Sequence, residues 1–156
     1  MLARLGDVLN AQESGERFVT AVAARLRRTA PDALEVVLAR GGHTYPVLVR
    51  AWGDVAVLRS EGRLLGVFPG PVPEETLHVL RPGDALVLYT DGITESRRDD
   101  ELFGEDRLAD VMAAHSTQGA EDLADAVLAA ADAFRSGPAE DDVALLVLRF
   151  TGDGAP

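Results

Sequence analysis

The order of the expected elements predicts an α+β fold, in which strands and helices occupy separate blocks of the chain. A short helix opens the sequence, strands fill the region 17–90, two helices follow within 104–134, and 143–150 is typical of a final strand. The alternation of single strands and helices that builds parallel sheets is not seen. The pattern therefore favours layered sheets and helices.

Length and composition set the domain organisation. A chain of 156 residues is long enough for one domain with a hydrophobic core and too short for two comfortable ones. No internal repeat or low-complexity segment interrupts it. We expect one domain over residues 1–150 and a flexible, polar, glycine-rich tail over 151–156.

The first part of the chain begins with a helix and a strand pair. Residues 17–28 are rich in β-branched and small apolar side chains, and 34–40 forms a similar run after a Pro-Asp turn. A short amphipathic helix is predicted at the start of the chain because apolar residues recur at helical spacing, namely Leu2, Leu5, Val8 and Leu9.

Two further hairpins are expected before the helices. The first joins strands 45–50 and 54–58 around Trp-Gly, and the second joins strands 76–80 and 85–90 around Arg-Pro-Gly-Asp, which is a strong turn signal. Between them, 66–73 holds two glycines and three prolines, which predicts a stiff loop.

The last part of the chain holds two helices and a strand. Apolar residues recur at helical spacing over 104–114 and again over the alanine-rich stretch 120–134. The nearly continuous apolar run 143–150 predicts a strand that is buried on both faces.

The charge balance and the absence of cysteine exclude several classes of protein. Fifteen basic against 26 acidic residues give a net charge of −11, which argues against a nucleic-acid or anionic-membrane surface. Without cysteine there is no disulfide framework and no Cys-based zinc site. No signal-like segment and no apolar run of about 20 residues is present. We expect a cytoplasmic protein.

Carboxylates stand at the ends of two strands that are expected in the core. Asp91 directly follows the apolar run that ends at Thr90, and Asp141 and Asp142 precede the last strand. Rigidly held carboxylates in a shared cleft suit hard cations such as Mg²⁺ or Mn²⁺. Asp-Gly is also a common turn, and paired Asp residues also cap loops, so the pattern alone leaves both interpretations open.

Five motifs in order resemble a known family. They are ALVLYTDGITE at 85–95, FGEDRL at 103–108, DDVALLV at 141–147, Gly42-His43 followed by Pro46, and RFVTA at 17–21. Together they resemble the serine phosphatase domain of the stage II sporulation protein E type, within the metal-dependent protein phosphatase superfamily. The resemblance covers about residues 1–150.

The resemblance implies a fold, a reaction and a site. It implies a β-sandwich flanked by helices and a two-metal centre of Mn²⁺ or Mg²⁺ whose water attacks a phosphoserine or phosphothreonine directly. The substrate would be a phosphorylated anti-sigma-factor antagonist in bacterial partner switching. Asp91 and Asp141 match the family's metal ligands. Gly92, Asp142, Glu95 and His43 are possible supporting residues, with His43 expected to shape a turn through a hydrogen bond.

One family motif has no counterpart in this sequence. The family's first metal-binding segment, GD-x-x-GHG, is missing, and Asp7 is expected to be a solvated helix residue instead. We therefore expect a domain that is incomplete on its N-terminal side, with unpaired sheet edges that favour self-association. A non-catalytic binding module of the same fold is the alternative function. A structural cation site in an unrelated α+β protein is the third possibility.

Overall fold

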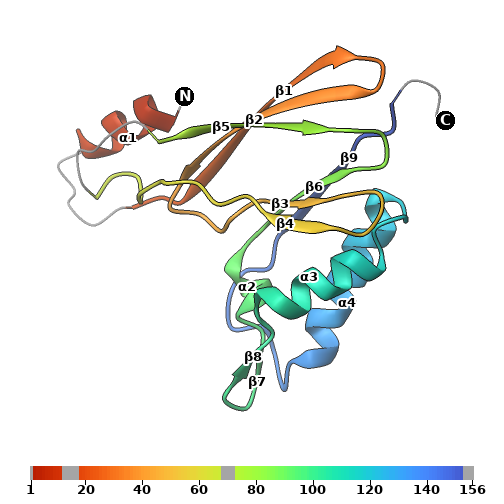
Figure 1. Cartoon of the computed structure of the whole chain (residues 1–156). Coiled ribbons are helices and arrows are strands. Elements are labelled where there is room, and N and C mark those ends of the chain that lie inside the picture. Colours follow the sequence, from red (N-terminus) through yellow and green to blue (C-terminus); the bar gives the residue numbers. More distant parts are fainter. Residues whose placement is uncertain (1, 12–17, 68–72, 153–156) are drawn as a thin grey trace. The chain divides into compact units, whose positions relative to one another are not determined.

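The computed structural model describes residues 2–11, 18–67 and 73–152 (Figure 1). By its internal contacts the chain divides into two compact units. The first unit comprises Met1–Tyr45 and Arg59–Leu80, and the second comprises Pro46–Leu58 and Arg81–Pro156. Each unit contains one main sheet.

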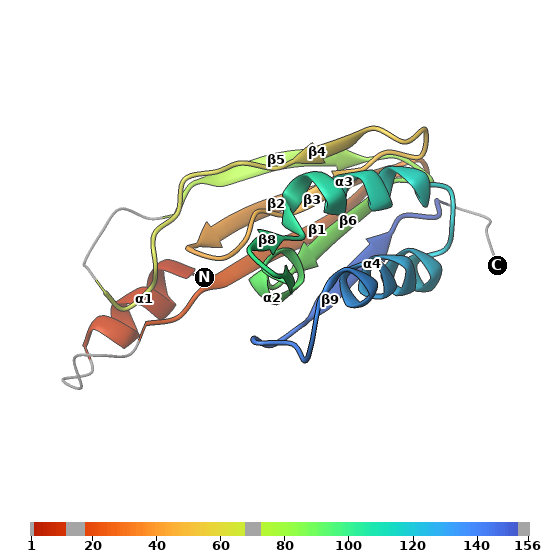
Figure 2. The same cartoon turned by 90° about the horizontal axis from the view of Figure 1, so that it is seen from below.

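The first unit is an antiparallel sheet with one helix. The sheet order is β1-β2-β5, with β1 at Ala21–Ala30, β2 at Ala33–Gly41 and β5 at Glu75–Leu80. Side chains alternate between its two faces, so Val36 and Leu38 are buried while Leu77 on the other face is 61% exposed. The helix α1, Leu2–Asn10, contacts β2 (Figure 2).

The second unit is built on a sheet of four antiparallel strands. The order is β4-β3-β6-β9. Its bounds are Val47–Val49 for β3, Val55–Val57 for β4, Ala85–Tyr89 for β6 and Leu145–Arg149 for β9. β6 is central and almost entirely buried, as its apolar sequence requires.

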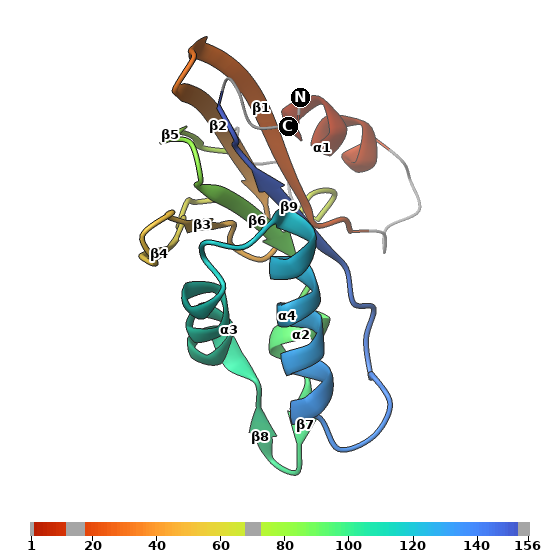
Figure 3. The same cartoon turned by 90° about the vertical axis from the view of Figure 1, so that its right-hand side faces the viewer.

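Two helices cover the hydrophobic core of the second unit. α3, Gly104–Ala114, and α4, Ala120–Phe134, contact each other, and α4 also contacts β9 (Figure 3). A four-residue helix, α2 at Asp91–Thr94, and a small hairpin of β7, Arg97–Arg98, and β8, Glu101–Leu102, connect β6 to α3. The core unites apolar residues of the sheet and of α2, α3 and α4, including Val49, Val87, Ile93, Leu108, Met112, Leu123 and Val127.

A buried carboxylate fixes the turn before β6. Asp84 is completely buried and pairs with the Arg50 guanidinium at 2.8 Å. Its two carboxylate oxygens also accept hydrogen bonds from the main-chain N–H groups of Ala51 and Arg81, at 3.0 and 2.8 Å. A buried charge is tolerated when it is paired and fully hydrogen-bonded in this way. Asp84 therefore ties the β3–β4 turn to the β5–β6 turn.

The predicted α+β class is confirmed, the short helix expected at the start of the chain is α1, and the helices predicted at 104–114 and 120–134 have the predicted bounds. The strand predicted at 17–28 begins only at Ala21, because Val19 exchanges main-chain hydrogen bonds with Leu65 instead of with β2. Arg17, and most of the predicted loop 66–73, lie outside the described residues. The small helix α2 and the hairpin β7–β8 were not predicted.

The last strand differs from its prediction in length and in burial. It spans Leu145–Arg149 instead of 143–150, and Leu146 is 60% exposed. The prediction of burial on both faces is wrong, because Leu145 and Val147 pack against the core of the second unit while Leu146 points to the opposite face of the sheet. No helix within the described ranges is long and apolar enough to cross a membrane.

Candidate functional site

The two acidic segments predicted from the sequence meet at one end of the β6–β9 strand pair. Because these strands are antiparallel, with Tyr89 opposite Leu145, the end of β6 lies beside the start of β9. Asp91 follows β6 and opens α2, while Asp141 and Asp142 precede β9. The sheet register thus brings together segments that are about fifty residues apart in the chain.

Thr90 joins the two segments by hydrogen bonds. Its N–H donates to the Ala144 carbonyl at 3.0 Å, which extends the ladder beyond β6. Its hydroxyl donates to the Asp142 carbonyl at 2.8 Å and accepts from the Ala144 N–H, also at 2.8 Å. A side chain that donates to one residue and accepts from another two positions away fixes the path of that segment.

Gly92 allows the two segments to approach closely. A Cβ atom placed on Gly92 would lie 2.6 Å from the Asp142 carbonyl oxygen and 3.2 Å from that of Asp141. The first distance is shorter than real contacts of a Cβ atom, and the atom that it meets belongs to the main chain. A residue with a side chain would therefore push the segments apart.

The carboxylates of this site are exposed and partly oriented. Asp91, Asp141 and Asp142 are all solvent-exposed. The Asp141 Oδ1 atom accepts the Asp142 N–H at 2.7 Å, which restrains the Asp141 side chain and leaves its other oxygen for a ligand. The Asp91 carbonyl accepts the Glu95 N–H at 2.7 Å and so closes the short helix α2.

The donor set partly fits a hard divalent cation. Carboxylate oxygens from Asp91 and Asp141 are the type of ligand that Mg²⁺ and Mn²⁺ prefer. However, no group of three or more His, Cys, Asp or Glu residues that could hold a metal ion is found among the described residues. These residues would therefore supply only part of a coordination sphere.

Glu95 and Ser96 lie directly beside this site. Glu95 is exposed and lines a small cavity together with Gly92 and Asp141. Ser96 is buried and donates its hydroxyl to the Gly92 carbonyl at 3.0 Å. The sequence did not indicate the structural role of Ser96, and Thr90 was noted only as part of the motif at 85–95. A small polar residue beside an acidic turn carries no sequence signal for the hydrogen bonds that it forms.

His43 is the predicted supporting residue that belongs to the first unit. Its Nδ1 atom lies 3.2 Å from the Thr20 hydroxyl, and its carbonyl accepts the Arg40 guanidinium at 2.9 Å. The preceding Gly42 has φ +73°, a conformation that favours glycine. These bonds are those expected of a residue that shapes a turn.

A hollow of about 750 Å³ adjoins the acidic segment in the second unit. One of its walls is the second half of α4, and the other is the loop from Ala139 to Val143. Asp141 lines both this hollow and the small cavity that contains Glu95. The candidate site is thus continuous with a larger surface depression.

Comparison with known proteins assigns the family. The family model described as stage II sporulation protein E (SpoIIE) matches residues 1–151. The chain belongs to the SpoIIE family. Three of the five motifs that carried the resemblance lie at the joined ends of β6 and β9 and at the start of α3. A search of curated proteins gave no match.

Solved structures of phosphatase domains share the SpoIIE-family fold of this chain. The RsbU and RsbW domains of a Mycobacterium tuberculosis protein match with TM-score 0.76 and 25% identity, over 95% of this chain and 41% of that one. The phosphatase domain of the Bacillus subtilis cell fate determinant SpoIIE matches with TM-score 0.70 and 18% identity, over 99% and 67%. The catalytic domain of the serine/threonine phosphatase PstP, solved with two manganese ions, matches with TM-score 0.55 and 15% identity, over 94% and 65%.

The chain covers only part of these relatives. It spans 41% of the Mycobacterium tuberculosis chain and about two thirds of the other two. Its fold is that of a phosphatase domain of the SpoIIE family, of which this sequence holds a portion.

Proposed function

We propose that this chain is the portion of a metal-dependent protein serine/threonine phosphatase that contributes Asp91 and Asp141 to the metal centre. The observation that carries the proposal is the joining of their two segments by Thr90 and by the close approach of Gly92. Membership of the SpoIIE family supports a phosphatase reaction.

Asp91 and Asp141 would hold Mn²⁺ or Mg²⁺, as the manganese-containing PstP structure suggests. When bound, such a cation polarises the phosphoryl group and lowers the pKa of a bound water. Further ligands would come from water molecules or from another polypeptide segment, because the described residues supply too few. The role of Thr90, Gly92 and Asp142 is to hold the two carboxylates at a fixed separation.

The substrate that we propose is a phosphorylated signalling protein in the bacterial cytoplasm, of the anti-sigma-factor-antagonist type. This part of the proposal extends the family resemblance. It is supported by the matched Mycobacterium tuberculosis protein, in which RsbU and RsbW domains occur together.

A non-catalytic binding module is the second candidate function. The shortage of metal ligands among the residues that the structure describes favours it. The fold and the surface around Asp141 would be retained, while the chain would recognise a signalling partner without hydrolysis.

Hydrolysis of a phosphoserine peptide in the presence of Mn²⁺ tests the proposal. We expect phosphate release by the wild-type chain that is lost in Asp91→Asn and kept in Asp110→Asn, because Asp110 is an exposed residue of α3 that lines neither the hollow nor the small cavity beside Asp141. Equal activity in the two variants would refute the assigned site. A folded chain that releases no phosphate would favour the binding module.

Self-association is the remaining partner proposal. Strands β1 and β5 form the edges of one sheet, and β4 and β9 form those of the other, as far as the described residues show. Edge strands present unpaired N–H and C=O groups to other chains. We expect a concentration-dependent increase in mass in light scattering. A constant monomer mass over a hundredfold range of concentration, on the order of micromolar to tenths of millimolar, would contradict it.

A further inference from the structure

The hollow beside Asp141 has an exposed apolar wall. Leu128 on α4 is 37% exposed and Val143 on the loop before β9 is 41% exposed, although both belong to amphipathic or apolar segments. Ala129 and Ala131 of α4 complete this wall. Exposed apolar side chains that line a hollow gain free energy when another apolar group covers them.

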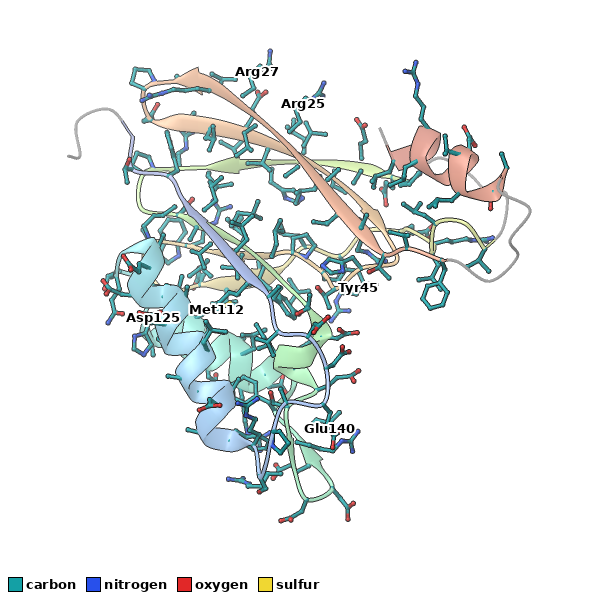
Figure 4. All side chains as sticks on the ribbon, turned by 180° about the vertical axis from the view of Figure 1, so that it is seen from behind. Arg25, Arg27, Tyr45, Met112, Asp125 and Glu140 are labelled. Atoms are coloured by element: carbon teal, nitrogen blue, oxygen red, sulfur yellow. The ribbon has the colours of Figure 1, made fainter. Side chains whose placement is uncertain are left out.

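The rim of the same hollow is acidic. Four carboxylates line it, from Asp132, Glu140, Asp141 and Asp142, against a single guanidinium, that of Arg135. Arg135 forms an ion pair with Asp132 and offsets one of the four charges, so the lining keeps a net charge of −3. Figure 4 labels Glu140 on the loop that follows α4. Its carboxylate is 77% exposed and lies 3.8 Å from Arg97, a distance at which an exposed pair contributes little.

The charge of the rim selects the type of ligand. The negative rim and the net charge of −11 would repel a nucleic acid, an anionic membrane or an acidic peptide. A cationic side chain would be attracted, and the apolar wall would add a contact that a free cation cannot make. The hollow therefore fits a polypeptide segment with an apolar residue next to Lys or Arg.

We propose that this hollow binds a segment of the phosphoprotein substrate that carries an apolar residue beside basic residues. The inference rests on the proposed function and deepens it. Asp141 lines the hollow and is also a candidate metal ligand, so a segment seated here would bring a neighbouring phosphoserine close to the candidate metal site. Asp132 and Glu140 are the specificity-determining charges, because neither matches a metal ligand of the family.

Peptide binding tests the inference without requiring hydrolysis. Two labelled phosphoserine peptides would be compared by fluorescence anisotropy in metal-free buffer, one with Leu-Arg-Arg beside the phosphoserine and one with Leu-Glu-Glu. We expect the basic peptide to bind about tenfold more tightly. Asp132→Lys combined with Glu140→Lys should invert this preference. Leu128→Ser should weaken both peptides about threefold.

A matched control lies on the same helix. Asp125 is an exposed residue of α4 that does not line the hollow, and Figure 4 labels it on the helix itself. Asp125→Lys should keep the preference for the basic peptide. The inference is overturned if the two peptides bind equally, or if the double variant keeps the wild-type preference.

The outcomes also separate this inference from the proposed phosphatase activity. Basic-peptide preference without any Mn²⁺-dependent hydrolysis would contradict the phosphatase and leave the docking hollow in place. Mn²⁺-dependent hydrolysis with no preference between the peptides would support the phosphatase and contradict the docking hollow. A second copy of the chain is a competing occupant, because Leu26 on β1 is exposed among Arg25, Arg27 and Arg28. If no peptide binds, and if Asp132→Lys combined with Glu140→Lys abolishes self-association, the substrate proposal is overturned. The occupant of the hollow would then be a second copy of the chain.

Discussion

Replacing Thr90 by Val removes the side-chain hydrogen bonds that join the two acidic segments while keeping the shape of the residue. The hydroxyl donates to the Asp142 carbonyl and accepts from the Ala144 N–H, each at 2.8 Å. In Thr90→Val both partners lose a protein contact, and the main-chain bond from the Thr90 N–H to Ala144 remains. The change thus tests the joining of the segments with little change in packing.

The expected loss of stability follows from these two bonds. A typical intramolecular hydrogen bond contributes about 1 kcal/mol net, so two of them give about 2 kcal/mol. The partners at Asp142 and Ala144 are exposed, and water replaces part of this loss. We therefore expect the free energy of unfolding to fall by about 1 to 2 kcal/mol. Mn²⁺ affinity should fall as well, because the separation of the carboxylates is no longer fixed.

Urea unfolding measures the first effect and calorimetric Mn²⁺ titration the second. Trp52, the single tryptophan, lies in the β3–β4 turn and reports on the second unit. Thr90→Ser is the matched control, because it retains the hydroxyl and should stay close to the wild type in both assays. A Val variant that matches the wild type in urea midpoint and in Mn²⁺ affinity would refute the reasoning.

Three further predictions follow from other contacts. Gly92→Ala should lower the stability of the second unit by about 1 to 3 kcal/mol in urea, because its Cβ would meet a main-chain carbonyl, and an unchanged midpoint would contradict this. Asp84→Asn should cost about 3 kcal/mol by the same measurement, because it removes the buried carboxylate charge that pairs with Arg50, and a loss below about 1 kcal/mol would show that the pair is not needed. The Arg107 guanidinium lowers the pKa of Glu101 below its ordinary value of 4.5, and Arg98 adds a smaller effect in the same direction. The stability that Glu101 contributes is therefore present above pH 4.5 and is lost as the pH falls through the lower folded pKa. Glu101→Gln should thus be less stable than the wild type at neutral pH and equally stable in acid. Thermal melts of both proteins at several pH values measure this difference.

The helices of this chain were predictable because their apolar spacing is local. Residues 104–114 and 120–134 were predicted to the residue and the short first helix by its spacing, since no distant partner is needed to recognise them. Strand limits depend on partners. Val19 has the β-branched character of a strand residue, yet it pairs with Leu65 instead of with β2, and the sequence carries no signal for that choice.

The acidic residues of the candidate site could be predicted from the sequence, but the contacts that hold them together could not. Asp91 and Asp141 were located by their places at strand ends and by the family motifs, and their assignment as metal ligands stays a prediction. The roles of Thr90 and of Gly92 depend on the register between β6 and β9, which only the fold shows. The docking hollow was also hidden, because α4 and the loop before β9 form it together.

Shared coordination by Asp91 and Asp141 is the central claim, and a double-mutant cycle of Mn²⁺ affinity tests it most directly. Calorimetry would compare the wild type with Asp91→Asn, Asp141→Asn and the double variant, with Asp110→Asn as the control. If both carboxylates hold the same metal centre, each single change should lower the affinity at least about tenfold, and the double change should add little to either. Additive small losses, or single variants that bind Mn²⁺ as the wild type does, would contradict a shared metal site at this end of the sheet.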